Sequence, residues 1–185
     1  DLQGKPVAVC GSQSTRHGIV LAKNYEARDC GVKTAEPVWK ARSKCPGLTV
    51  LPPNYTRYLK FSRLAMDIYR SYTNLVEAFG IDECWLDVTE STRLFGDGPR
   101  MAHTIKDRIN GEMGITASVG VSFNKIFAKL GSDLKKHNAV TVIGKNDFKD
   151  IIWSLPIERL MYVGKSTKKK LNRIGILTIG QLAYA

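Results

Sequence analysis

The sequence predicts an α+β fold with a ferredoxin-like central region, preceded by a small strand-containing region and followed by a helical one. Residues 54–143 show helix and strand patterns in the order helix–strand–strand–helix–strand–helix–strand, which is typical of ferredoxin-like domains. Residues before this region contain three short apolar runs, and residues after 144 contain patterns for short helices only. Hydrophobic residues make up 43% of the 185 residues, which is enough for a globular core.

In the first region, residues 6–10 are expected to form a buried strand that ends at a glycine. Residues 18–24 are expected to form a second strand. A helix is predicted over residues 35–44, because a Cys-Pro-Gly turn follows it. A third short strand at residues 48–51 is broken by a Pro-Pro pair.

The central region begins with a long helix over residues 55–72, which Asn54 can cap. Two apolar strands, residues 75–79 and 84–88, then flank a tight bend at residues 80–83. The elements that complete the region are a helix at 99–113, a strand at 115–121, a helix at 123–134 and a strand at 139–143.

The charge balance favours a polyanionic partner. Lys and Arg number 28 against 17 Asp and Glu, a formal net charge of +11. Nucleic acid is the usual partner of such a surface, although many basic soluble proteins bind none. No run of about 18 apolar residues predicts a membrane span, and no signal peptide opens the chain, so we expect a cytoplasmic protein. The chain opens without Met, and we expect its natural N-terminus to lie upstream.

The cysteines and histidines show no metal-binding spacing. Without a C-x-x-C pair, zinc knuckles and redox motifs are disfavoured, and the thiols are expected to be reduced and mostly buried. The histidines are expected on the surface or in loops. The residues concerned are Cys10, Cys30, Cys45, Cys84, His17, His103 and His137.

Two adjacent acids at the predicted bend carry the strongest chemical signal. Neighbouring strand residues point to opposite faces, so Asp82 and Glu83 can serve one site only where the chain bends, as Gly80 allows. Clustered carboxylates suit magnesium, and such a pair could clamp two ions for phosphoryl transfer. A solvated turn is the alternative, and the apolar flanking strands make it less favoured without removing it. Asp87 lies about 13 Å further along an extended strand, so we expect it to hold a neighbouring turn instead.

The segment GIDECWLDVT resembles the S-I-D-E-x-x-x-D motif of Y-family DNA polymerases, and the chain as a whole resembles their DNA polymerase IV, or DinB-like, branch. The resemblance implies two Mg²⁺ ions, with Asp82 as the bridging ligand and Glu83 as a ligand of the catalytic metal. Gly80 stands where the family most often has Ser, which is not a metal ligand. The implied activity is template-directed addition of deoxynucleotides to a primer 3′ end, with low-fidelity translesion synthesis in DNA repair.

Two further segments resemble the family's nucleotide-binding motifs. N-Y-E-A-R is similar to its fingers signature, which implies that Tyr25 and Arg28 bind the triphosphate; by themselves they could be a helix-surface pair. GVSFNKIFAKLGSD resembles the G-V-S-x-N-K-x-x-A-K-x-x-S-D motif, and Lys136 thereby inherits a triphosphate contact. The family continues Lys-Pro-Asn-Gly where this chain has Lys-His-Asn-Ala, which leaves the shape of this loop open.

The C-terminal region is basic, with six basic and two acidic residues from position 150 onward. Its pattern of two short helices and a Gly-containing hairpin resembles a helix-hairpin-helix, which grips the DNA backbone without reading sequence. A Lys-rich solvated helix is the alternative. The DNA contacts implied by the resemblance are Gly164, Lys165, Ser166, Thr167 and Lys168.

The resemblance covers nearly the whole chain and implies fingers at 1–53, palm at 54–143 and part of a thumb at 144–185. The family's first palm strand, with another metal-binding Asp and a steric gate, is expected upstream of the chain, and a little-finger domain after it. We therefore expect the chain itself to bind DNA weakly and to polymerise little. The implied partners are primer–template DNA, an incoming dNTP and a sliding clamp that binds a C-terminal tail; the enzyme is expected to be monomeric.

Two other functions remain as alternatives. A non-catalytic DNA-binding module with a degenerate palm would explain the charge and the C-terminal hairpin, but not the acidic pair on an apolar bend. A nucleotide cyclase with a similar palm would explain the carboxylates, but it has no need of a DNA-gripping C-terminal region.

Overall fold

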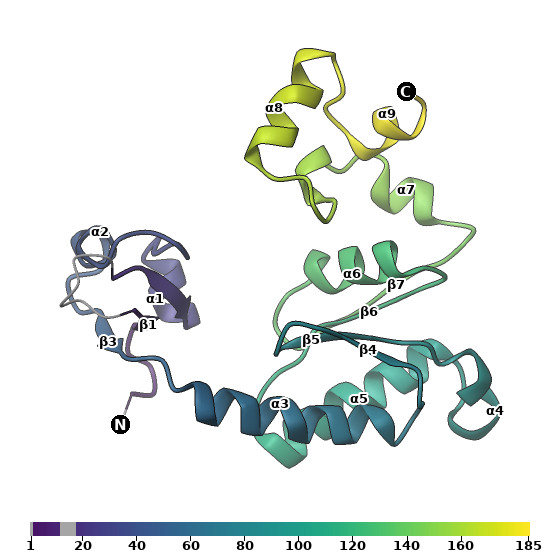
Figure 1. The fold of residues 1–185 in the computed structure, drawn as a ribbon, viewed down its shortest axis with the longest axis horizontal. Helices are drawn as coiled ribbons and strands as arrows, with labels where there is room; N and C mark the ends of the chain where they lie inside the picture. The colour runs from purple at the N-terminus through teal and green to yellow at the C-terminus, as the bar shows by residue number, and fades with distance from the viewer. Residues whose placement is uncertain (1, 12–17) are drawn as a thin grey trace. The chain divides into compact units, whose positions relative to one another are not determined.

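The computed structural model describes residues 2–11 and 18–185, which form two compact units that divide between Tyr58 and Leu59 (Figure 1). Both units contain helices and strands, so the predicted α+β class is confirmed. The second unit contains the predicted palm from residue 59 onward and the predicted thumb, and the three-part division stays a prediction. Among the described residues, no helix has both the length and the apolar character needed to cross a lipid bilayer.

The first unit is built on a three-stranded sheet. β1 (Val7–Cys10) lies in the middle, antiparallel to β2 (Val20–Lys23) and parallel to β3 (Thr49–Leu51). α1 (Tyr25–Asp29) follows β2, and α2 (Val38–Lys44) precedes β3. Small apolar side chains fill the core, which consists of Ala8, Cys10, Val20, Ala27, Val32, Val38, Ala41, Cys45 and Leu48.

The division between the units falls within the first turn of α3 (Tyr55–Arg70). In the second unit, α3 and α5 (Gly98–Met113) lie on one side of the antiparallel pair β4 (Val76–Phe79) and β5 (Glu83–Leu86) (Figure 1). Asn54 accepts a hydrogen bond of 3.0 Å from the backbone N–H of Arg57, which confirms the predicted cap. The core between these helices and β5 consists of Ile68, Tyr72, Met101, Ile105 and Ile109, with Leu86 packed against it.

Two short helical segments, η1 (Thr89–Ser91) and α4 (Thr92–Phe95), join β5 to α5. A second strand pair follows α5, in which β6 (Val119–Ser122) is parallel to β7 (Val140–Ile143). The strand predicted from residue 115 is too long, because only residues 119–122 find a partner in β7. Within the described chain, β4–β5 and β6–β7 form two separate ladders.

Helix α6 (Lys125–Leu134) connects β6 to β7 and lies on the opposite side of the strands from α3 and α5 (Figure 1). Its contact with β6 is very close, because a Cβ on Gly120 would lie 1.8 Å from the carbonyl oxygen of Ala128. Only glycine therefore fits at this position of β6. This contact fixes the position of α6 along the strand.

The C-terminal helices pack onto α6 and β7. They are α7 (Phe148–Ile152), η2 (Ile157–Arg159), α8 (Lys165–Arg173) and α9 (Ile179–Ala183). One apolar cluster joins them to the strand pair, so this region belongs to the same compact unit as the hairpin. The fully buried side chains of this cluster are Leu130, Ile143, Ile152, Ile157 and Ile179.

Candidate metal and nucleotide site

The predicted bend between β4 and β5 is present and is closed by a three-residue loop. Phe79 pairs with Glu83 at the end of the ladder, so Gly80, Ile81 and Asp82 form the turn. Gly80 has a φ of +77°, a left-handed conformation that favours glycine. Asp82 is exposed at the tip, and Glu83 begins β5. The turn thus places two carboxylates next to each other at the end of a rigid hairpin.

The alternation of the strands gives the hairpin two different faces. Cross-strand partners share a face, so Glu77, Phe79, Glu83 and Trp85 lie on the same side. On the other face, Leu86 packs into the core that α3 and α5 form. The face that carries Glu83 is therefore free for contacts with α6.

Lys129 of α6 binds the hairpin carboxylate. Its ammonium lies 3.0 Å from Glu83 Oε1 and 2.8 Å from Asp133 Oδ2, and its side chain is only 17% exposed. Burial lowers the pKa of Lys129, but the hydrogen bonds that its ammonium donates to Asp133 and Glu83 outweigh burial and leave its pKa above the ordinary value. Lys129 is therefore a charged link between the hairpin and α6.

Asp133 extends this link to the predicted triphosphate-binding lysine. Its second carboxylate oxygen accepts a hydrogen bond of 2.6 Å from Lys136, just beyond the end of α6. Burial raises the pKa of Asp133, but hydrogen bonds from Lys129 and Lys136 outweigh burial and leave its pKa below the ordinary value. The structure therefore joins Glu83 and Lys136 through two intermediate charges. Sequence reasoning missed this role of Lys129, although its four-residue spacing from Asp133 was a usable signal.

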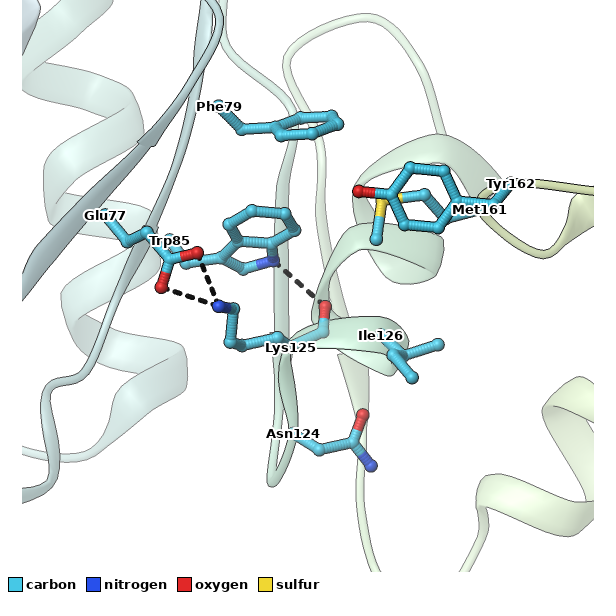
Figure 2. Close-up of a pocket in the computed structure, with 8 residues that line it drawn as sticks. All are labelled: Glu77, Phe79, Trp85, Asn124, Lys125, Ile126, Met161 and Tyr162. Carbon is cyan, nitrogen blue, oxygen red and sulfur yellow. Dashed lines mark hydrogen bonds and ion pairs between the residues drawn. The ribbon is translucent and has the colours of Figure 1, made fainter.

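Lys125, the other lysine of this helix face, holds the neighbouring strand. Its ammonium lies 2.5 Å and 2.6 Å from the two carboxylate oxygens of Glu77. The same ammonium lies 4.8 Å from the centre of the Trp85 ring, and the Trp85 indole N–H donates to the Lys125 carbonyl at 3.0 Å (Figure 2). Lys125 and Lys129, four residues apart on α6, thus both bind the hairpin.

Asp87 holds a turn, as the sequence predicted. Its Oδ1 accepts hydrogen bonds from the Thr89 hydroxyl at 2.6 Å and the Thr89 backbone N–H at 3.0 Å. These bonds lower the pKa of Asp87 and fix the start of η1. In the part of the chain that the structure describes, no three His, Cys, Asp or Glu side chains gather as a metal cage.

The donor set at the hairpin fits magnesium. Mg²⁺ is usually held by one or two carboxylates together with waters and substrate phosphates, rather than by an all-protein cage. Asp82 and Glu83 are two such carboxylates, and Lys136 lies at the other end of the network, paired with Asp133. Their roles as ligands stay predictions.

Tyr25 and Arg28 lie on α1 in the first unit and are both exposed. Asn24 fixes this helix, because its side-chain oxygen accepts from the backbone N–H of Ala27 at 3.2 Å and from that of Val7 in β1 at 2.8 Å. Asn24 therefore anchors the start of α1 to the central strand β1. The triphosphate contact of Tyr25 and Arg28 stays a prediction.

The predicted DNA-binding turn is the start of α8. Gly164 is the N-cap residue, and a Cβ on it would meet nothing within 4 Å, so the backbone is open to a ligand. Lys165, Ser166 and Thr167 in the first turn are exposed. Lys168 forms an ion pair with Glu158, so its charge is already balanced by this acid. Contact of these five residues with DNA stays a prediction.

The four cysteines are free thiols, as expected, but they differ in how far they are buried. Cys10 and Cys45 are buried, Cys84 is half-buried and Cys30 is exposed. Burial raises the pKa of Cys84 to about 11. His103 and His137 are exposed as expected, whereas His17 lies outside the described residues.

Residues 1–133 match the profile of the IMS family, described as impB/mucB/samB. The chain belongs to this family. DNA polymerase IV of Acetivibrio thermocellus is 63% identical to this chain, and the match covers 99% of the chain and 46% of the relative. DNA polymerase IV 1 of Bacillus subtilis is 46% identical over 100% of the chain and 44% of the relative.

Solved structures agree with this family membership. A structure titled "Insertion ternary complex of Dbh DNA polymerase" matches with a TM-score of 0.91 and 34% identity, over 100% of this chain and 54% of the other. A crystal structure of DinB from Sulfolobus solfataricus matches with a TM-score of 0.89 and 33% identity, again over 100% and 54%. The resemblance to Y-family DNA polymerases is confirmed. The chain spans about half the length of the relatives it matches.

Proposed function

We propose that this chain supplies the metal-binding carboxylates of a template-directed DNA polymerase. The observation that carries the proposal is the position of Asp82 and Glu83 at the tip of one hairpin. The ion pairs through Lys129 and Asp133 then join Glu83 to Lys136, which carries positive charge suited to a triphosphate. The relatives named DNA polymerase IV support the same activity.

In this reaction the primer 3′-hydroxyl oxygen bonds to the α-phosphorus of the incoming dNTP, the bond to pyrophosphate breaks, and the hydroxyl proton passes to solvent water. Two Mg²⁺ ions, when bound, would stabilise the charge on the attacking and leaving oxygens. Asp82 would hold both ions and Glu83 the ion at the hydroxyl. Lys136, Tyr25 and Arg28 would orient the triphosphate, because Arg and Lys donate strong charge-assisted hydrogen bonds to phosphate.

The proposal also assigns roles to the three regions of the chain, to the DNA contacts and to the cellular context of the enzyme. Residues 1–53 would act as fingers, 54–143 as palm and 144–185 as part of the thumb. The first turn of α8, from Gly164 to Lys168, would hold phosphates of the primer–template duplex through backbone N–H groups and Lys165. We further propose damage-tolerant, low-fidelity synthesis by a monomer in the cytoplasm, with recruitment by a sliding clamp.

Primer extension by the full-length gene product tests the activity. We expect extension in Mg²⁺ by the wild type and a loss of at least about 100-fold in the Asp82→Asn variant, because the carboxylate is replaced by a neutral amide. DNA affinity, measured by fluorescence anisotropy, should stay unchanged in the variant. Equal extension by both proteins would place the active site elsewhere.

A non-catalytic DNA-binding module is the second candidate. The net charge of +11 and the open backbone at Gly164 favour it, because both suit a DNA backbone without any catalysis. The same assay separates the two functions. Tight DNA binding without extension by the wild type would support the binding module and refute the polymerase.

A further inference from the structure

Two free cysteines of the first unit meet at the ends of two different helices. Cys30 is the C-cap residue of α1, and Cys45 is the C-cap residue of α2. Their side chains are close enough for the two thiols to share a hydrogen bond. Cys30 is exposed, whereas Cys45 is only 3% exposed. The pair therefore combines one thiol that solvent reaches with one that the protein covers.

A side-chain contact next to the thiols holds the two helix ends together. The Lys44 ammonium donates to the carbonyl of Gly31 at 3.0 Å, which ties the residue before Cys45 to the residue after Cys30. Lys44 also forms an ion pair of 2.5 Å with Glu36, a buried carboxylate. The reduced fold thus already keeps the two sulfur atoms near each other.

Packing and backbone hydrogen bonds fix the position of each cysteine. Cys45 belongs to the same core cluster as Ala27 of α1 and Ala41 of α2, and its backbone N–H donates to the Ala41 carbonyl at 3.0 Å. The backbone N–H of Cys30 donates to the Glu26 carbonyl at 3.2 Å. Two cysteines can be bridged without moving the backbone only when their side chains point toward each other. A hydrogen bond between the thiols meets this condition.

The two thiols are suited to different steps of an oxidation. Burial raises the pKa of the Cys45 thiol, and the contact with Cys30 raises it further. Because the thiolate is the reacting form, a buried thiol with a raised pKa is a poor first nucleophile. Cys30 is exposed, so an oxidant in solution reaches its sulfur first. Cys45 then lies where a second thiol can attack the oxidised sulfur.

We propose that Cys30 and Cys45 form a reversible redox pair, which closes to a disulfide when a peroxide oxidises it. The Cys30 sulfur attacks one peroxide oxygen, the O–O bond breaks, and the leaving hydroxide takes up the thiol proton as water. The Cys45 sulfur then attacks the sulfenic acid on Cys30, the S–O bond breaks, and the Cys45 proton leaves with the hydroxide as a second water. Two thiols are thus oxidised, one peroxide is reduced to two waters, and a dithiol reductant reverses the change.

A disulfide suits this pair better than a metal ion does. Zinc is held by three or four protein ligands, and the described residues bring no three His, Cys, Asp or Glu side chains together. The disulfide would join the ends of α1 and α2 and so fix the helix that carries Tyr25 and Arg28. The inference is independent of the proposed polymerase function, because the chemistry uses the two thiols alone.

Peptide mass spectrometry of the full-length gene product tests the inference. The protein is treated with hydrogen peroxide, its remaining thiols are blocked with iodoacetamide, and trypsin then releases residues 29–33 and 45–57. We expect these two peptides to be joined and two hydrogen atoms lighter than their sum, with dithiothreitol separating them again. Dilution of the protein should leave the joined fraction unchanged, because both thiols belong to one molecule.

Three variants serve as controls. Cys30→Ser, at an exposed position, should fold and leave Cys45 as a free thiol. Cys45→Ala should leave Cys30 without its partner, so that peroxide converts Cys30 to sulfinic acid. Cys84→Ala, at a half-buried cysteine of the other unit, should give the joined peptides as the wild type does.

The rate of joining shows whether the fold positions the thiols. Unfolding the wild type in guanidinium should slow the joining at least about 10-fold, because the folded contact raises the effective concentration of one thiol at the other. Equal rates in the folded and unfolded protein would overturn the inference. Wild-type Cys30 that stays unreacted, becomes sulfinic acid, or joins a different cysteine in place of Cys45 would also overturn it.

Discussion

Replacing Gly120 by Ala should dislodge α6 from the strand pair that supports the site. The added Cβ would lie 1.8 Å from the carbonyl oxygen of Ala128 and 2.6 Å from the backbone nitrogen of Ser132. Ordinary contact begins at 3.4 Å, so the helix would have to move by about 1.6 Å. Both atoms belong to the backbone of α6, and no side-chain rotation can relieve the clash.

The cost of this movement should exceed that of ordinary overpacking, which is about 1–3 kcal/mol. The helix contributes Leu130 to the core, and its displacement would open that core as well. We therefore expect the free energy of unfolding to fall by at least about 3 kcal/mol. The same displacement would separate Lys129 from Glu83.

Guanidinium denaturation followed by circular dichroism measures this loss. Gly111→Ala in α5 is the matched control, because a Cβ there would meet nothing within 4 Å. That substitution should raise stability by about 0.5–1 kcal/mol, since alanine favours a helix interior over glycine. A Gly120→Ala variant within about 1 kcal/mol of the wild type would refute the reasoning.

Three further predictions follow from the charges and thiols. Lys129→Met should lower the free energy of unfolding by about 1–2 kcal/mol, because two partly buried carboxylates lose their partner. Lys125→Met is the control: its side chain is 54% exposed, and the free energy of unfolding should change by less than about 0.5 kcal/mol. Urea titrations compare the two variants. Because the pKa of Asp133 lies below its ordinary 3.8, this carboxyl stabilises the fold at neutral pH and loses its contribution as the pH falls through the lowered pKa. Acid titration of Asp133→Asn should therefore show a shallower loss of stability below about pH 4 than the wild type, and an identical acid limb would contradict the ion-pair assignment. Iodoacetamide at pH 8 should modify Cys30 first and leave Cys84, with a pKa of about 11, almost unreacted, as peptide mass spectrometry would detect.

Local signals in the sequence predicted most helices and strands. Where a predicted boundary is wrong, the cause is either a local backbone conformation or a contact with a distant strand. Asn54 was recognisable as a cap because the hydrogen bond it accepts comes from only three residues away. The helix predicted from residue 35 starts at Val38, because Ala35 has a φ of +64° and Pro37 occupies the N-cap. The strand predicted from residue 115 is shorter because its length depends on β7, a distant partner that a local pattern cannot reveal.

At the site, too, features that depend on neighbouring residues could be predicted, and contacts between distant residues could not. The bend at Gly80 and the turn held by Asp87 depend on neighbouring residues, and both were predicted correctly. The bond from Lys129 to Glu83 joins positions 46 residues apart, so no sequence window contains it.

The most direct test of the metal role is the dependence of single-nucleotide incorporation on Mg²⁺ in the full-length gene product and its Glu83→Gln variant. Glu90→Gln serves as the matched control, since Glu90 is an exposed acid on η1, beyond the hairpin. If Glu83 binds the catalytic metal, its variant should lose at least about 100-fold in maximal rate at saturating dNTP, while the control keeps the wild-type rate. Equal rates and equal Mg²⁺ dependence in all three proteins would contradict a metal site at this hairpin.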